Sequence, residues 1–364
     1  MFAPPDSLIL VRQRAAVLRR VLAGLLLICL PAGGAFAAPK VVATILPIQS
    51  LAAAVTDGVT EVELLVAPGQ SPHHSALRPS QMRALTGADL VIWVGPSLET
   101  AMADAIESLP ADRRLAFEGD QALTWLSARA GGDIAAQGES SDGHGESHGH
   151  DHGHHDHGHH DHGHHDHGHH GHAHHDDGDH GHGDHGHVHT GLDPHVWLAP
   201  NNAAAMVRLI VKRLAAVDPQ NAARYQANAE QALARLAELD AALRSRLEPV
   251  ADRPFVVFHD AYRYFEHAYG LNVAGVVTVD ARNSPGVRRV AELRDRIRQL
   301  GATCVFSEPQ FPPRIVDTLV EGTDARLGVL DPVGAQLPRG PQTYFLLLEG
   351  LADSLVNCLE DTGR

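Results

Sequence analysis

The chain has 364 residues, of which 44% are hydrophobic, and its formal net charge at pH 7 is −15. Residues 131–192 contain 12 Asp or Glu and no Lys or Arg, so most of the negative charge lies in this one segment. A concentrated negative charge favours cations as ligands and argues against nucleic acid as a partner. Without this segment and the N-terminal 37 residues, roughly 270 residues remain, more than one hydrophobic core usually serves, so we expect two domains.

Residues 1–37 have the pattern of a cleavable signal peptide. Four arginines precede an apolar run over residues 21–30, and the small-residue sequence Ala35-Phe36-Ala37 follows. The apolar run is too short to span a bilayer. We therefore predict a soluble, exported protein, with a retained membrane anchor as the alternative.

Short apolar strands then alternate with helices. Strands are expected over residues 40–46, 61–66 and 89–94, with helices beginning near Ser50 and over residues 81–86. The strands are continuous apolar runs, which indicates a mostly parallel sheet covered by helices on both faces.

A tract rich in histidine, glycine and aspartate extends from about Asp142 to His189. The unit HHDHG recurs three times in it, and 23 of the 28 histidines of the chain lie there. The tract lacks the apolar residues whose burial would repay the entropy of ordering, so we expect residues 133–191 to form a disordered insertion. Neutral imidazoles are common ligands of transition metals, and the tract predicts several weak, exchangeable metal sites. A solvated linker without a functional role is the alternative.

Two helices are expected after this tract. Apolar residues at helical spacing predict a first helix that ends at Asp218-Pro219. A second apolar stripe predicts a helix over about residues 219–249, which would be roughly 45 Å long at 1.5 Å per residue. We interpret this helix as a link between two domains, and a coiled-coil segment is the alternative.

The alternation of strands and helices then restarts. Strands are expected over residues 254–258, 273–277, 304–306 and 327–330. Helices are expected from near Pro285 to Leu300 and from about Gln342 to Leu359.

The fold class that these patterns predict is α/β, with two lobes of mostly parallel sheet flanked by helices. The N-terminal lobe covers residues 38–199 and includes the insertion. Residues 200–250 form the helical region with the long linking helix, and residues 251–364 form the C-terminal lobe.

Removal of the signal peptide would leave two cysteines, Cys304 and Cys358. An exported protein is in an oxidising compartment, where two such cysteines are expected to pair. Two buried, unrelated thiols are the alternative.

Five histidines lie outside the tract: His73, His74, His195, His259 and His267. His73 follows the second strand, His195 lies where the tract rejoins the rest of the chain, and His259 directly follows the strand over residues 254–258. Loops at the carboxyl ends of parallel strands can converge, so these three rings are candidates for one site. Asp331 follows the strand over residues 327–330 in the same way. Three imidazoles and one carboxylate make a suitable four-coordinate Zn²⁺ site.

Two carboxylates are placed to orient these rings. Asp193 lies near His195 and Asp260 lies beside His259, and metal-bound histidines usually donate their second ring N–H to such a group. Judged on spacing alone, each of the three histidines could equally be an ordinary hydrogen-bonded loop residue. We take the other two histidines outside the tract as ordinary residues.

Six motifs, in one order along nearly the whole mature chain, resemble the metal-binding proteins of ABC importers, the cluster A-I (cluster 9) family. They are Ser71-Pro-His73 with Ala76-Leu-Arg-Pro-Ser80, Ala88-Asp-Leu-Val-Ile-Trp-Val-Gly-Pro96, Asp193-Pro-His195-Val-Trp-Leu-Ala-Pro200, Phe258-His-Asp-Ala-Tyr262, Phe306-Ser-Glu-Pro-Gln310 and Leu330-Asp-Pro332. The histidine-rich insertion, and a histidine at position 259 where the manganese and iron branches carry glutamate, resemble the zinc-specific branch.

The resemblance implies two lobes, a rigid linking helix and a zinc site in the cleft. His73, His195 and His259 match the three ligand positions of the family, and Asp331 matches a fourth position that some members use. Other members use water or a carboxylate near the first histidine as the fourth ligand, and the chain departs from them there because His74 follows His73. Glu308 could instead be an interior or interface carboxylate. The two cysteines resemble the disulfide of some zinc members.

The function that the resemblance implies is high-affinity capture of Zn²⁺ in the periplasm and its delivery to the membrane permease of an ABC importer. The protein would be a monomer and not an enzyme, with zinc as transported ligand and the insertion as a zinc buffer or sensor. Other periplasmic zinc-binding proteins are candidate partners. One alternative is a metal buffer or chaperone that acts mainly through the histidine tract. The other is a zinc-dependent hydrolase, because catalytic zinc also has three protein ligands and an open position, but no HExxH motif is present.

Overall fold

The computed structural model contains two sheets of four parallel strands each. It describes residues 37–129, 191–278, 287–310 and 314–360. The first sheet consists of β1 (Val41–Ala43), β2 (Val62–Leu64), β3 (Leu90–Trp93) and β4 (Arg114–Ala116), in the order β2-β1-β3-β4. The second consists of β5 (Phe255–His259), β6 (Val273–Thr278), β7 (Cys304–Ser307) and β8 (Arg326–Val329), in the order β6-β5-β7-β8. The prediction of parallel sheets is confirmed, and β4 is a strand that the sequence pattern did not indicate.

Helices cover both faces of the first sheet, which explains why its two central strands, β1 and β3, are apolar throughout. The helices are α2 (Leu46–Thr56), α3 (Pro79–Gly87) and α4 (Ala103–Glu107). Val41 and Ala43 of β1 pack in the core that includes α2, whereas Val42 packs with the residues of α3 and α4. Successive side chains of a strand point to opposite faces, so a strand buried on both faces has no polar positions.

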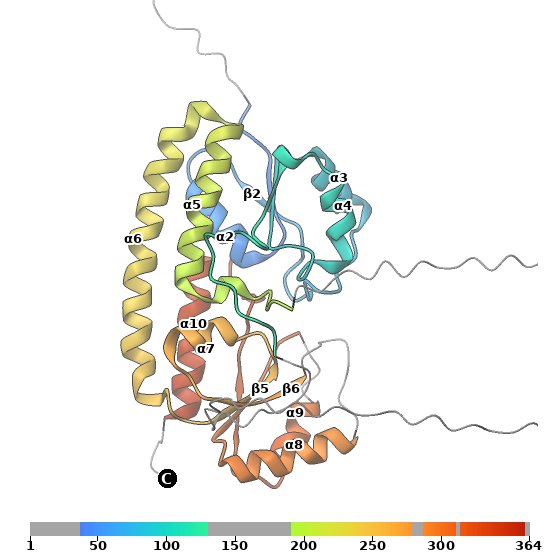
Figure 1. The fold of residues 1–364 in the computed structure, drawn as a ribbon, viewed down its shortest axis with the longest axis vertical. Coiled ribbons are helices and arrows are strands. Elements are labelled where there is room, and N and C mark those ends of the chain that lie inside the picture. The colour runs from blue at the N-terminus through green and yellow to red at the C-terminus, as the bar shows by residue number, and fades with distance from the viewer. Residues whose placement is uncertain (1–36, 130–190, 279–286, 311–313, 361–364) are drawn as a thin grey trace, which may run out of the picture. The chain divides into compact units, whose positions relative to one another are not determined.

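The second sheet is built in the same way. Helices α8 (Val287–Leu300) and α9 (Arg314–Val320) pack on one face of it, and α7 (Arg263–Tyr269) and α10 (Thr343–Leu359) pack in the core on the other face. Phe255 and Val257 of β5 belong to the core that includes α10, and Val256 packs with residues of α8 and α9. Figure 1 shows α8 and α9 together at one end of the molecule and α10 beside α7.

The helix that begins the first α/β half starts earlier than predicted. We expected it near Ser50, but α2 begins at Leu46, with Pro47 in its first turn. Proline is well tolerated there because the first N–H groups of a helix have no partner within the helix. The strand before it is correspondingly shorter than the predicted 40–46.

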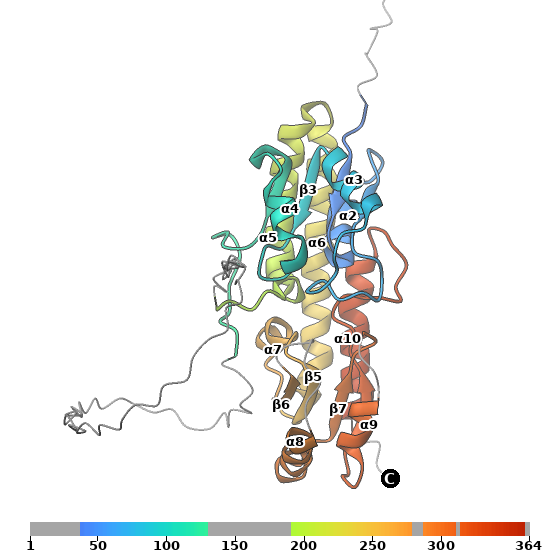
Figure 2. The same cartoon turned by 90° about the vertical axis from the view of Figure 1, so that its right-hand side faces the viewer.

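Two long helices, α6 (Ala222–Leu247) and α10, run beside both sheets, where a single linking helix was expected. α5 (Pro200–Val217) is followed by α6, a helix of 26 residues. α6 packs against α2 and α5 from the first half and against α7 from the second. α10 also packs on α2 and α6, and the Tyr344 N–H donates a 2.9 Å hydrogen bond to Ser50 Oγ. Figures 1 and 2 both show α6 and α10 side by side.

The two sheets therefore share one hydrophobic core. A single cluster of buried residues includes Ile48 of α2, Tyr225 of α6, Phe306 of β7 and Tyr344 of α10. The described residues from Lys40 onward form one compact unit. The predicted boundaries between the lobes stay predictions.

Cys304 of β7 and Cys358 of α10 form the disulfide expected from the sequence. Within the part of the chain that the structure describes, no helix is long and apolar enough to cross a membrane. All but the last residue of the predicted signal peptide, all but the last residue of the insertion and the start of the helix near Pro285 lie outside the described residues.

Candidate metal centre

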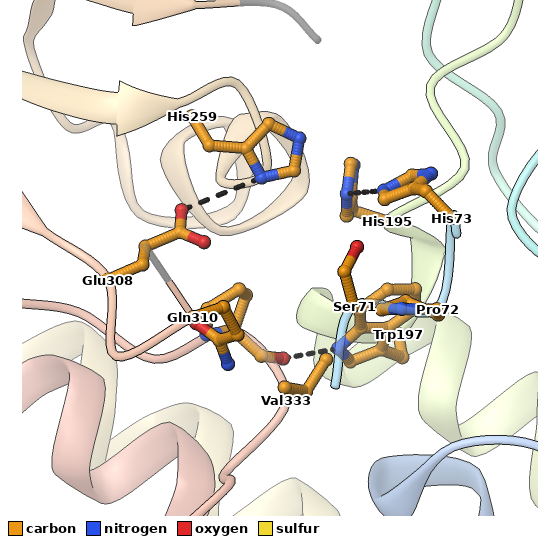
Figure 3. A pocket seen from close by; sticks show the side chains of 10 residues that line it. Ser71, Pro72, His73, His195, Trp197, His259, Glu308, Gln310 and Val333 are labelled. Atoms are coloured by element: carbon orange, nitrogen blue, oxygen red, sulfur yellow. Dashed lines mark hydrogen bonds and ion pairs between the residues drawn. The ribbon is translucent and has the colours of Figure 1, made fainter. Parts of the chain in front are cut away.

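Three histidines from separate loops converge at one point. His73 lies in the loop after β2, His195 precedes the short 3-10 helix Val196–Leu198, and His259 is the last residue of β5. Their ring centroids lie 5.0–5.6 Å apart. Each ring offers one nitrogen, and these nitrogens all lie within 4.8 Å of one another. Figure 3 shows the three rings facing the same space.

The spacing of two donors fits a tetrahedral zinc ion. The Nε2 atoms of His73 and His195 are 3.3 Å apart. Two nitrogens bound to one Zn²⁺ at 2.0–2.1 Å in tetrahedral geometry would be separated by roughly 3.3–3.4 Å. These two rings therefore hold their nitrogens where an ion would require them.

Burial keeps the His195 ring neutral. His195 is 4% exposed and His259 is 5% exposed, whereas His73 is half-buried. Burial lowers the pKa of His195 well below its ordinary value, and His259 lowers it further. A neutral imidazole is the form that binds metal. For His259, burial alone would lower the pKa, but the nearby carboxylates of Glu308, Asp260 and Asp193 together outweigh burial and raise it.

Asp193 orients the ring of His195, as the sequence suggested. Its Oδ1 lies 2.8 Å from His195 Nδ1 and also accepts a 2.9 Å hydrogen bond from the His195 backbone N–H. Burial raises the pKa of Asp193 to about 7. With Nδ1 bound to a carboxylate, the Nε2 of His195 is directed toward the other two histidines.

Asp260 does not take the same role for His259. It forms an ion pair with Arg129 at 3.5 Å, and the carboxylate beside the ring is that of Glu308, whose Oε1 lies 3.6 Å from His259 Nδ1. Neighbouring residues at the end of a strand point in different directions, so adjacency in sequence did not place Asp260 at the ring.

Asp331 is not part of the histidine cluster that the described residues form. Its Oδ1 accepts hydrogen bonds from Gln310 Nε2 and from the backbone N–H groups of Val333 and Gly334, and its Oδ2 accepts one from Ala335. Aspartate commonly satisfies backbone N–H groups in a turn in this way. β8 is an edge strand separated from β5 by β7, which explains why Glu308 and not Asp331 lies beside His259.

The three histidines line a pocket whose remaining walls come from both halves of the chain. The other lining residues are Ser71, Pro72, Trp197, Glu308, Gln310, Pro332 and Val333. Trp197 Nε1 donates a 2.8 Å hydrogen bond to the Pro332 carbonyl oxygen, which joins the segment after His195 to the second half. The sequence pattern did not indicate Trp197 or Gln310, because wall residues have no ligand chemistry to identify them.

The other two histidines of the described chain lie outside the group. The His74 ring centroid is 5.9 Å from that of His73, and His267 is exposed on α7. Neither belongs to the set of mutually close donors.

Comparisons with known proteins agree with this geometry. The chain matches the family model described as zinc-uptake complex component A, periplasmic, over residues 41–358. It is 45% identical over 320 residues to the high-affinity zinc uptake system protein ZnuA of Brucella abortus (strain 2308), covering 88% of this chain and 91% of that protein. It is 34% identical over 344 residues to the protein of the same description from Yersinia pestis, covering 93% of this chain and 96% of that protein.

A solved crystal structure of ZnuA has the same fold. The TM-score is 0.65 with 22% sequence identity, and the alignment covers 89% of this chain and 100% of that chain. The family model spans both sheets and all three clustered histidines. The chain therefore belongs to the ZnuA family, zinc-uptake complex component A, periplasmic.

Proposed function

We propose that this protein captures Zn²⁺ in the periplasm for an ABC-type importer, with His73, His195 and His259 as the ligands of the ion. As a member of a zinc-uptake family, the chain is a transport binding protein and not an enzyme, and zinc is its cargo. The ion is then delivered to a membrane permease.

The observation that carries the ligand assignment is the spacing of the donors. Three imidazole nitrogens lie within 4.8 Å of one another, and the 3.3 Å separation of His73 Nε2 from His195 Nε2 suits a tetrahedral ion. Two of the rings are buried, so the ion would be largely removed from water. Imidazole ligands also accept Cu²⁺ and Ni²⁺, so the ligand set alone does not select zinc.

The test is a zinc titration in competition with a chromophoric chelator. His73→Ala, His195→Ala and His259→Ala should each weaken the tight site by at least roughly 100-fold, more than the roughly 10–100-fold that loss of an outer partner costs. His267→Ala, an exposed histidine on α7, is the matched control and should bind zinc like the unaltered protein. Retention of the tight site in all three ligand variants would refute the assignment.

We also propose that the histidine tract is an accessory zinc buffer or sensor with weaker, exchangeable sites. Support comes from its composition, because 23 histidines and 10 carboxylates between residues 142 and 189 favour divalent cations. Deletion of residues 142–189 should remove the weak sites and leave the tight site intact. Loss of the tight site on deletion would favour a protein that acts mainly through the tract.

We also propose a signal peptide, a monomeric state and further partners for this protein. Residues 1–37 are a signal peptide that directs export and is then removed. The mature protein works as a monomer, and other periplasmic zinc-binding proteins are candidate partners. Mass spectrometry of the protein recovered from the periplasm tests the cleavage site after Ala37, and light scattering of the same material tests the oligomeric state.

A further inference from the structure

Glu308 directly follows β7, and β7 lies next to β5 in the second sheet. The parallel register pairs Val257 of β5 with Phe306 of β7. Continued by two residues on each strand, the same register places Glu308 beside His259. Neighbouring strands are about 4.8 Å apart, so a side chain at the end of β7 can reach the ring at the end of β5.

Two contacts hold the Glu308 carboxylate in place. Its Oε1 lies 3.6 Å from His259 Nδ1, and the Tyr262 hydroxyl donates a 3.0 Å hydrogen bond to the same oxygen. The Tyr262 hydroxyl is also 3.2 Å from the Leu330 carbonyl oxygen. Glu308 and Tyr262 are each 4% exposed, so water hardly competes for these contacts. Figure 3 shows the Glu308 carboxylate directed at the His259 ring from within the pocket.

The contact between Asp193 and His195 shows how a buried carboxylate can orient a histidine ring. Asp193 Oδ1 contacts Nδ1 of that ring, and Nε2 faces His73. A carboxylate at Nδ1 keeps the proton on that nitrogen and leaves the lone pair of Nε2 for a metal. Glu308 has the equivalent position at the second buried ring.

We propose that Glu308, supported by Tyr262, is the positioning residue that holds His259 with Nδ1–H toward its carboxylate and Nε2 toward the zinc ion. This inference rests on the proposed zinc site and adds the group that orients one of its ligands. It gives Glu308 the role that sequence adjacency suggested for Asp260.

The experiment compares Glu308→Gln and Tyr262→Phe with the unaltered protein. Glu99→Gln is the matched control, because Glu99 is a fully buried carboxylate in the turn after β3 whose contacts are Thr44, Val94 and Gly95. Zinc affinity is measured by chelator competition. The proton position on the His259 ring is measured from its ¹⁵N NMR shifts in the zinc-free protein at pH 8.

We expect Glu308→Gln to weaken zinc binding by roughly 10–100-fold with one ion still bound, and Tyr262→Phe to weaken it less. The His259 proton should lie on Nδ1 in the unaltered protein and be shared between both nitrogens in Glu308→Gln. Glu99→Gln should change neither measurement. A merely structural role of Glu308 would lower the melting temperature without moving the ring proton.

Wild-type zinc affinity or an unmoved ring proton in Glu308→Gln would overturn the inference. His259→Ala separates this failure from that of the zinc site itself. If His259→Ala loses tight binding while Glu308→Gln keeps it, only the positioning role is wrong. If His259→Ala also keeps tight binding, the proposed ligand set is wrong.

Discussion

The hydroxyl of Tyr264, on α7, donates a 2.8 Å hydrogen bond to the carbonyl oxygen of Asp193. The same hydroxyl accepts a 3.1 Å hydrogen bond from the Leu126 N–H. Leu126 and Asp193 lie in the two segments that flank the insertion, which also form a bridge between Ser127 and Leu192. The Asp193 carboxylate in turn orients His195, a proposed zinc ligand. Tyr264, which belongs to the second half of the chain, therefore fixes the position of a ligand that precedes α5.

Replacing Tyr264 with Phe should therefore affect both stability and zinc binding. The change leaves the Leu126 N–H and the Asp193 carbonyl without this partner, which costs about 1–3 kcal/mol when the groups stay buried. We expect zinc affinity to fall several-fold because Asp193 is held less firmly. Urea unfolding and chelator competition measure the two effects. Tyr225→Phe, which removes a 2.7 Å hydrogen bond to Asp218, should lower stability alone.

Zinc affinity should fall as the pH falls. A proton and the ion compete for the same ring nitrogens, so zinc is lost once the histidines become charged. The raised pKa of His259 places its protonation above the ordinary range, whereas the lowered pKa of His195 keeps that ring neutral to more acidic pH. Chelator competition from pH 8 to pH 5 should show an affinity that begins to fall above the ordinary histidine pKa of about 6.5, as His259 takes up a proton, and that continues to fall toward pH 5. Constant affinity across this range would contradict histidine ligation.

Glu99 should make the zinc-free protein less stable as the pH rises. Burial raises the pKa of Glu99 to about 7 from its ordinary 4.5, although hydrogen bonds from Thr44, Gly95 and Val94 oppose the change. Between these values the folded chain keeps a proton that the unfolded chain has released, so the free energy of unfolding decreases with rising pH.

Comparison of the unaltered protein with Glu99→Gln isolates this contribution. The difference in unfolding free energy should change by on the order of 2–3 kcal/mol between pH 4.5 and pH 7.5, because one pKa unit corresponds to about 1.4 kcal/mol. Glu118→Gln, which alters a half-buried carboxylate that accepts hydrogen bonds from Ser97, is the matched control. A pH-independent difference for Glu99→Gln would show that the carboxyl is not destabilised by burial.

Opening the Cys304–Cys358 disulfide should lower stability without removing the zinc site. The cysteines are 54 residues apart, and a loop of that length contributes about 4 kcal/mol by restricting the unfolded chain. We expect Cys304→Ser/Cys358→Ser to unfold at lower urea concentration and still to bind one zinc ion tightly, because neither cysteine lines the pocket. Loss of tight binding in the folded variant would show that the disulfide also shapes the site.

Much of the fold could be predicted because its signals are local. The apolar runs around Val42, Val91 and Val256 indicate strands buried on both faces, and such strands occur in parallel sheets flanked by helices. The histidines at positions 73 and 259 follow strands, and loops after parallel strands open at the same edge of a sheet. Hydrophobic periodicity likewise indicated α5, α6 and α10. Short elements such as β4 and α4 were missed because a few residues show no clear period.

The sequence by itself determined the apolar strands, the long helices and the candidate histidine ligands, because each depends on neighbouring residues. Tertiary structure decided which carboxylate meets which ring. Strand order places β7 beside β5 and leaves β8 at the edge, so Glu308 lies next to His259, and Asp331 instead forms hydrogen bonds within its own turn. It also decided that α10 runs beside α6. Such pairings join segments that are far apart in the chain, and a local sequence pattern contains no information about which segments become neighbours in the fold.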